Sequence, residues 1–452
     1  MASLSLKDCH DNVVNKSKFD LGLLVRGCDK LNNAFHDNEI EIFDFQKHKV
    51  RLPEEKIIDY TLAEDFKIAN FTTSRYVGFY STTIGNESVS ITINPRFGDT
   101  VRDYLFAHAL GIYLPKGESG KEGSSSKNIW LISLLWRGSA EKAITKSQIP
   151  KIYNKIEKNN PFFRGRLNVQ KQMRHNSVDQ SKFYCTYSQF SYDNTINQTL
   201  RYCYRLLNKE YSSILQGFAE HDEMLSDFGV SNNPITLREI NKIVYTPMTK
   251  YYKPLMELSK AIIGFKSYQN SSNLLQKSGF SVFLDMAEVW ENYLYNLLRK
   301  ELDDFEVENP NLTGDYPLFE DGSRKIRPDI LVRKNGKVIA VIDAKYKYYT
   351  SIGSYAGISG AVNREDLYQM TTYLHRFGNI NTVGLFVAPF DSQEEPKIIN
   401  GLEQRIGVLG LDIDVKVNIN DQNIEDKEGC IKELLSREGD FITKLRILLD
   451  GF

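Results

Sequence analysis

The feature that most constrains the fold is a pair of apolar stretches separated by Asn335-Gly336. Ile330–Val332 comes before this dipeptide, and Val338–Ile342 comes after it. Asn-Gly between two apolar runs is typical of a β-hairpin, because both residues tolerate positive φ angles. Strand and helix patterns alternate over the following residues, which indicates a mixed sheet covered by helices. The sequence therefore predicts an α/β domain built around this pair of strands.

An acidic residue stands at the outer end of each strand: Asp329 begins the first and Asp343 ends the second. Lys345 follows two residues later and so shares a face with Asp343. Two convergent carboxylates can bind Mg²⁺, or Mn²⁺ in its place, and such a metal activates water for phosphodiester hydrolysis. A neighbouring lysine can position the attacking water and offset charge on the phosphorus. The alternative is that these residues are ordinary polar groups at strand ends.

The length of the hairpin loop decides whether the two acids share a face. A two-residue loop would place Asp329 opposite Ile342, so that Asp343 would point away from it. A three-residue loop, Lys334–Gly336, would place Asp329 opposite Val341 and both acids on one face. We therefore expect a type I turn followed by a G1 bulge, with positive φ at Gly336.

Two helices flank the hairpin in the sequence and carry further candidate site residues. Apolar residues recur at helical spacing from Phe283 to Arg299, and Glu291 lies on this helix, where it is a candidate third acid. Its alternative role is that of an exposed helix charge. Gln369 and Tyr373 are four residues apart on a second expected helix, so they share a face. They are candidates to bind a substrate phosphate or to steady Lys345, and the alternative is simple packing.

Three regions are expected along the chain. Residues 1–115 are predicted to be β-rich, with a hairpin at 76–94, and 128–270 to be mainly helical. Residues 271–452 hold the acids and the lysine. A loop between the first two regions contains Gly117–Lys121, which resembles part of a phosphate-binding loop but lacks its spacing and its Ser or Thr. We therefore expect this chain to bind no nucleotide itself.

Charge is unevenly distributed although the formal net charge is only -1. Residues 137–174 hold ten Lys and Arg against two acids, whereas 301–322 hold eight acids and no Lys or Arg. Cations interleaved with aromatic residues can bind DNA, although Phe162-Phe163 is also typical of a core anchor. The candidate DNA-binding residues in the basic segment are Arg164, Arg166, Lys171 and Arg174.

The five cysteines are scattered and form no C-x-x-C pair, which argues against a disulfide framework or a zinc ribbon. The N-terminus has no signal pattern, and no run of 18 apolar residues occurs. We therefore expect a cytoplasmic location without membrane insertion.

Taken in order, Glu291, Pro328-Asp329, Asp343-Ala344-Lys345 and Gln369-x-x-x-Tyr373 resemble the Gln-x-x-x-Tyr branch of the PD-(D/E)xK nucleases. More narrowly, the chain resembles the McrC and LlaJI-type subunits of restriction systems over roughly residues 75–390. Further supporting stretches are Asp285–Glu291, Ile91–Arg96, Arg164–Val169 and Asp193–Asn197. Arg96 departs from the family, which more often has Lys there.

The resemblance implies a Mg²⁺-dependent endonuclease that cuts double-stranded DNA. It also implies a GTP-hydrolysing AAA+ partner ring that the N-terminal region docks on and stimulates, and dimerisation of nuclease domains for double-strand cleavage. Two other functions stay open. The chain could be a non-cleaving activator of the partner NTPase, or a stand-alone RecB-like repair nuclease. The lack of a four-cysteine cluster and of a fused helicase weighs against the repair nuclease.

Overall fold

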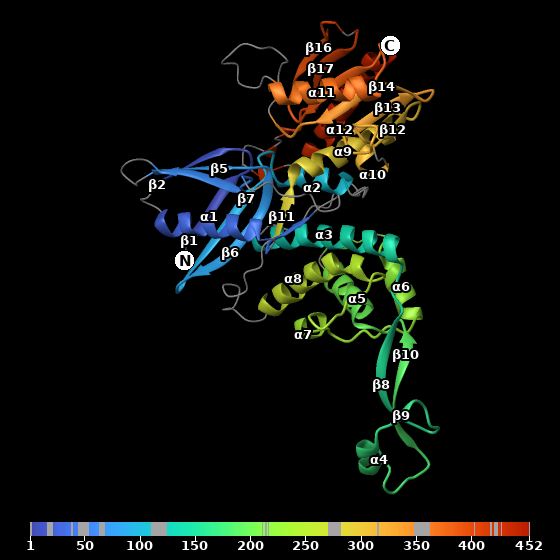
Figure 1. The fold of residues 1–452 in the computed structure, drawn as a ribbon. Helices are drawn as coiled ribbons and strands as arrows, with labels where there is room; N and C mark the ends of the chain where they lie inside the picture. The colour runs from blue at the N-terminus through green and yellow to red at the C-terminus, as the bar shows by residue number, and fades with distance from the viewer. Residues whose placement is uncertain are drawn as a thin grey trace. The chain divides into compact units, whose positions relative to one another are not determined.

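The computed structural model describes residues 2–15, 21–37, 39–43, 54–62, 68–109, 124–209, 211–212, 215, 217–269, 282–313, 316–347, 362–401, 403–415, 418–419, 424–425 and 427–451. These form a mixed α/β chain with several sheets. The chain divides into two compact units (Figure 1). Unit 1 joins Met1–Ser119 to Gln276–Phe452, and unit 2 is Gly120–Leu275.

The N-terminal part of unit 1 contains a five-stranded sheet in the order β1-β7-β6-β11-β3. Its strands are β1 (Ala2–Lys7), β3 (Glu41–Phe43), β6 (Tyr76–Ile84), β7 (Glu87–Asn94) and β11 (Val282–Asp285). The expected hairpin is confirmed as β6–β7, with Gly85 at φ 63° in the turn. A second, three-stranded sheet consists of β2 (Asp11–Asn15), β5 (Ile68–Thr73) and β4 (Ile58–Leu62).

Two helices accompany these strands and were not expected from the sequence. They are α1 (Leu21–His36) and α2 (Asp99–Ala109). In α1, Leu24, Cys28, Leu31 and Phe35 recur at helical spacing and are fully buried. They form one core with strand residues of the five-stranded sheet, including Leu4, Val89, Ile91 and Phe283. This helix therefore covers one face of the sheet.

The prediction of a helix from Phe283 onwards was wrong at its first residues. Phe283 and Leu284 belong to β11, which pairs with β6 and β3. The helix α9 (Met286–Glu301) begins only after Asp285, whose side chain accepts a hydrogen bond from the Ala287 N–H at 3.0 Å. An aspartate in this position is an N-cap, so the boundary was encoded in the sequence.

The C-terminal part of unit 1 is a six-stranded mixed sheet in the order β12-β13-β14-β15-β17-β16. β14, β15 and β17 are parallel, and the other neighbours are antiparallel. The strands are β12 (Glu306–Glu308), β13 (Ile330–Lys334), β14 (Lys337–Ala344), β15 (Val383–Ala388), β16 (Gln393–Ile398) and β17 (Arg405–Gly410). The helices beside it are α9, α10 (Pro310–Thr313), α11 (Arg364–Phe377) and α12 (Lys427–Asp450).

Helices pack against this sheet, as expected. On one face, Met370, Tyr373 and Leu374 of α11 share a core with residues such as Val341 and Phe386. α9 also contacts the sheet, and the indole N–H of Trp290 donates to the Val387 carbonyl at 3.1 Å. A short two-stranded ribbon, β18 (Asn418–Ile419) and β19 (Ile424–Glu425), precedes α12. Because α11 and α9 cover parts of the sheet, polar side chains can gather at the ends of its strands.

Unit 2 is mostly helical but contains a sheet that was not expected. Its helices are α3 (Ser124–Ser147), α4 (Val169–His175), α5 (Thr195–Asn208), α6 (Ala219–Asp227), α7 (Leu237–Ile240), η2 (Lys250–Tyr252) and α8 (Lys253–Gln269). Apolar residues at helical spacing are buried at Leu200, Tyr204 and Leu207 of α5 and at Leu255, Leu258 and Ile262 of α8.

The basic segment of unit 2 forms the sheet β8–β10–β9 rather than helices alone. β8 (Ile152–Asn160) and β10 (Phe183–Ser191) make a long antiparallel ribbon, with β9 (Arg166–Leu167) and α4 toward its far end (Figure 1). Gly165 allows this arrangement, because its φ is +70° and an added Cβ would lie 2.7 Å from the Thr186 carbonyl oxygen. We call residues 151–191 the arm.

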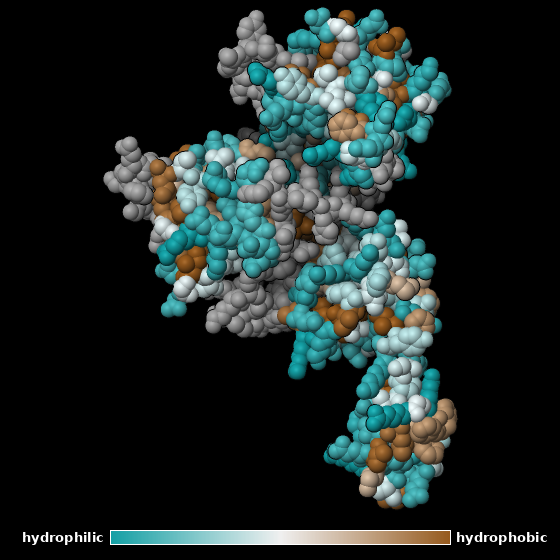
Figure 2. Space-filling model, in the orientation of Figure 1, coloured by the Kyte–Doolittle hydropathy of each residue, from teal (hydrophilic) through white to brown (hydrophobic). Residues whose placement is uncertain are grey.

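The arm exposes apolar side chains, which Figure 2 shows as brown patches on its surface. Phe162 and Phe163 are 62% and 57% exposed, so the core-anchor interpretation of this pair was wrong. Val169, Met173 and Val178 are also exposed. None of the five cysteines, all of which the structure describes, forms a disulfide, as expected. Among the helices that the structure describes, none has the length and apolar character that a membrane span requires.

Candidate active site

The hairpin β13–β14 places both acids on one face, but by a different route from the one expected. Lys334 pairs with Lys337, so the loop is the two-residue Asn335-Gly336, and the prediction of a three-residue loop with a G1 bulge was wrong. Positive φ at Gly336 is confirmed at 76°, and Asn335 is also positive at 53°, as a type I′ turn requires.

A β-bulge at Ile339 restores the register that the short turn would have lost. Arg333 pairs with Val338, but the next pair is Val332 with Ala340, so Ile339 has no partner. The pairs that follow end with Ile330 opposite Ile342. Asp329 precedes this pair and Asp343 follows it, so the two acids come at directly opposed positions of the hairpin and share a face.

The contacts of Asp329 agree with this register. Its Oδ2 accepts a hydrogen bond from the Ala344 N–H at 2.7 Å, beside Asp343. Burial, together with the nearby carboxylates of Glu291 and Asp343, raises the pKa of Asp329 well above its usual range. The two acids therefore repel one another when both are ionised.

Lys345 lies between two carboxylates on the α11 side of the sheet. Its Nζ is 2.9 Å from Asp343 Oδ2 and 3.1 Å from Asp366 Oδ1. Burial alone would lower the pKa of Lys345, but the charges of Asp343, Asp366 and Asp329 more than offset it, and the pKa is raised. The lysine is therefore a fixed cation whose position is set by its ion pairs.

Gln369 and Tyr373 continue this network along one face of α11. Lys345 Nζ donates to Gln369 Oε1 at 3.3 Å, and Gln369 Nε2 donates to the Tyr373 hydroxyl at 2.6 Å. The Tyr373 hydroxyl in turn donates to the Arg327 carbonyl at 3.0 Å. Of the two roles considered for this pair, the contacts favour steadying the lysine. They also tie α11 to the residues just before Asp329.

Glu291 is buried on α9 and lies near this group. Asn311 Nδ2 donates to its Oε1 at 2.8 Å, so it is not the exposed helix charge of the alternative interpretation. The structure thus brings together all six candidates: Glu291, Asp329, Asp343, Lys345, Gln369 and Tyr373. The sequence reasoning missed Asp366, although its spacing of three residues before Gln369 places it on the same face of α11.

The donor set fits a hard divalent cation. Among the described residues, no three acidic, histidine or cysteine side chains already form a complete metal-binding group. Mg²⁺, however, is commonly bound by only one or two carboxylates together with water. Asp329 and Asp343 supply two, and Asp343 Oδ2 is buried without a well-formed hydrogen bond although Lys345 is near. The mutual repulsion of the acids is what a bound cation would relieve.

The four candidate DNA-binding cations lie in the arm of unit 2. Arg166 is in β9, Lys171 and Arg174 are in α4, and Arg164 comes just before β9. Lys171 forms an ion pair with Glu157, which neutralises part of its charge. The Arg164 guanidinium stacks 4.3 Å from the centre of the Tyr187 ring.

The fold and the site together define an α/β protein whose mixed sheet presents two opposed acids and a lysine, the layout expected of a PD-(D/E)xK domain. The chain belongs to the family described as McrBC 5-methylcytosine restriction system component, which matches residues 71–388. No curated protein matches the chain.

Two solved assemblies contain similar chains. One is the refined half-complex from a tetradecameric assembly of Thermococcus gammatolerans McrB AAA+ hexamers with bound McrC, with 15% identity, a TM-score of 0.49, and coverage of 96% of this chain and 99% of that one. The other is the Thermococcus gammatolerans McrBC complex, with 14% identity, a TM-score of 0.31, and coverage of 66% and 88%.

Proposed function

We propose that this chain is the metal-dependent endonuclease subunit of an McrBC-like restriction complex and hydrolyses phosphodiester bonds of double-stranded DNA. The observation that carries the proposal is the opposed pair Asp329 and Asp343 with Lys345 held beside it. Membership of a restriction-system family supports it.

The chain's own residues would divide the work as follows. Asp329, Asp343 and Glu291 would hold Mg²⁺ or Mn²⁺, which supplies charge neutralisation at the phosphate and a water of lowered pKa. Lys345 would orient the attacking water and offset developing negative charge. Asp366, Gln369 and Tyr373 would keep the lysine in place, because each contacts it directly or through one neighbour.

The partner would be an AAA+ ring of the McrB type that hydrolyses GTP, docked through the N-terminal region of this chain. The solved assemblies to which this chain is similar contain McrB AAA+ hexamers or are McrBC complexes. Cutting both DNA strands would require two nuclease domains to act together. Co-purification with the ring, and GTP hydrolysis by the ring with and without this chain, test the association.

Cleavage is the decisive test, and it requires the full chain together with its ring. We expect Asp343→Asn and Lys345→Ala each to lower the cleavage rate by at least about 100-fold, because each group acts mainly in the transition state. Lys334→Ala, an exposed lysine of the same hairpin, is the matched control and should cut normally. EDTA should abolish cutting.

Two results would decide against a nuclease. Unchanged cleavage by Asp343→Asn would remove the site assignment. A wild-type chain that stimulates the ring's GTP hydrolysis but never cuts would favour the non-cleaving activator.

We also propose that Arg164, Arg166, Lys171 and Arg174 of the arm bind DNA phosphates. Replacing all four by Gln should weaken DNA binding and reduce its salt dependence by about 0.9 in log–log slope for each phosphate that is no longer neutralised. The exposed apolar residues beside these cations are also typical of a protein interface. Loss of ring association with unchanged DNA affinity would therefore refute the DNA role and move the docking surface to the arm.

A further inference from the structure

Arg96 connects the N-terminal sheet to the catalytic strand of the nuclease sheet. It lies two residues beyond the end of β7, and its Nη2 donates to the main-chain carbonyl of Tyr346 at 3.1 Å. Tyr346 directly follows Lys345. The residues involved are far apart in the sequence but belong to the same compact unit.

The Arg96 guanidinium is enclosed by three aromatic rings. Its central carbon is 4.3 Å from the ring centre of Tyr346, 4.8 Å from that of Phe97 and 5.1 Å from that of Phe390. The rings also contact one another, with Phe97 5.4 Å from Phe390 and 6.1 Å from Tyr346. A planar guanidinium can stack on rings while donating in its plane, which a lysine ammonium cannot do.

The main chain of Arg96 is itself fixed. Its N–H donates to Asp8 Oδ1 at 2.6 Å, and the Asp8 N–H donates to the Asn94 carbonyl at 3.0 Å. Asp8 is fully buried at the end of β1, the strand beside β7. The side chain of Arg96 therefore projects from a rigid sheet end rather than from a free loop.

The main chain around Lys345 is consequently held on both sides of this residue. The Lys345 N–H donates to the Val387 carbonyl at 2.9 Å, and the carbonyl of the next residue is held by Arg96. We propose that Arg96 is a positioning residue: it fixes the Tyr346 carbonyl and so sets where Lys345 Nζ lies relative to Asp343. The catalytic consequence rests on the proposed nuclease function, whereas the positioning itself does not.

The first measurement is the rate at which acetic anhydride modifies Lys345 in the full chain, determined by mass spectrometry. Losing a charge-assisted hydrogen bond should raise this rate roughly tenfold or more in Arg96→Met. Arg96→Lys keeps the charge without the stacking, so we expect an intermediate rate. Arg102→Met is the matched control: Arg102 is a buried arginine of unit 1 paired with Asp99 and Asp103, and its loss should leave Lys345 at the wild-type rate.

The second measurement is cleavage with the partner ring. We expect Arg96→Met to lower kcat with little change in KM, because the DNA-binding surface is untouched, and Arg96→Lys to recover part of kcat. A folded Arg96→Met variant that modifies Lys345 at the wild-type rate overturns the proposal. If Arg96→Met does not fold, a wild-type rate in Arg96→Lys overturns it equally. A chain that never cuts but shows the expected change in modification refutes the nuclease function and supports the positioning role.

Discussion

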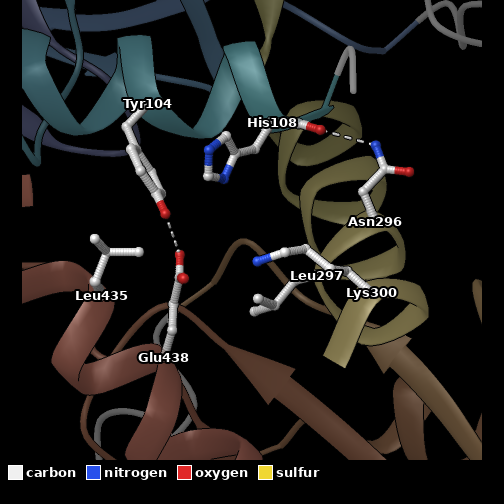
Figure 3. A pocket seen from close by; sticks show the side chains of 7 residues that line it. All are labelled: Tyr104, His108, Asn296, Leu297, Lys300, Leu435 and Glu438. Carbon is white, nitrogen blue, oxygen red and sulfur yellow. Dashed lines mark hydrogen bonds between the residues drawn. The ribbon is translucent and has the colours of Figure 1, made fainter. Parts of the chain in front are cut away.

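Acidification should destabilise unit 1 through His108, the last-turn histidine of α2. His108 lines a cavity of about 30 Å³ with Tyr104, Lys300 and Glu438, where α2, α9 and α12 meet (Figure 3). Burial, together with the charge of Lys300, lowers the pKa of His108 to about 4. An unfolded chain would have a histidine pKa of about 6.5. Between these values the unfolded state binds a proton that the folded state does not.

The sign and the size of the effect follow from this difference. The contribution of His108 to the free energy of unfolding is fully present above the unfolded pKa of about 6.5. It is lost as the pH falls from about 6.5 to about 4, because the unfolded state then binds a proton that the folded state does not. Each pKa unit corresponds to about 1.4 kcal/mol, so the full loss is about 3 kcal/mol, and about 2 kcal/mol is lost by pH 5. His108→Gln cannot take up the proton and should lack this loss. The raised pKa of Glu438 acts in the opposite direction, but it is present in both proteins and cancels in their difference.

Pulse proteolysis in urea, with fragments of α2 and α9 detected by mass spectrometry, measures the stability of this unit. We expect the wild type to lose about 2 kcal/mol more than His108→Gln between about pH 7.5 and about pH 5. Equal losses in the two proteins would refute the reasoning, because they would mean that His108 is protonated in the folded state at its ordinary pKa.

The same assay tests three further substitutions. Gly336→Ala should destabilise the hairpin by about 1 kcal/mol, because φ is +76° at this position. Gly439→Ala, which lies in α12 with open space around it, should instead stabilise the protein by about 0.5–1 kcal/mol. Equal effects of the two substitutions would contradict the turn assignment. Tyr373→Phe should cost about 1–3 kcal/mol, because Gln369 and the Arg327 carbonyl lose a buried partner, and should slow cleavage less than Lys345→Ala does; unchanged stability would refute this network.

Local sequence patterns correctly predicted several of the elements that carry the candidate site. The strands β13 and β14, the helix α11 and the positive φ of Gly336 follow from apolar spacing and turn chemistry, and the structure has them. The alternation rule also correctly required both acids to share a face. The rule could not predict how the two acids come to share that face, because the apolar pattern gives no sign of the β-bulge at Ile339.

Features that depend on contacts between residues far apart in the sequence could not be predicted from local patterns. Phe283 reads as helical because its spacing from Trp290 fits a helix, but pairing with β6 makes it a strand. The position of Arg96 on Tyr346 also depends on how two sheets pack together. Such contacts join residues roughly 200 to 250 positions apart, and neither end carries a pattern that specifies its partner.

The placement of β11 also sets an order of events during synthesis. β7 ends at Asn94 and β11 begins at Val282, so roughly 190 residues, including all of unit 2, leave the ribosome before the five-stranded sheet can close. At about 5–20 residues per second this interval lasts roughly 10–40 s, during which the β6 edge is open to pairing with other chains. Because α9 and the acids come later still, the nascent chain passes this period without the residues of the proposed site. Unit 2 is therefore free to fold before this sheet closes.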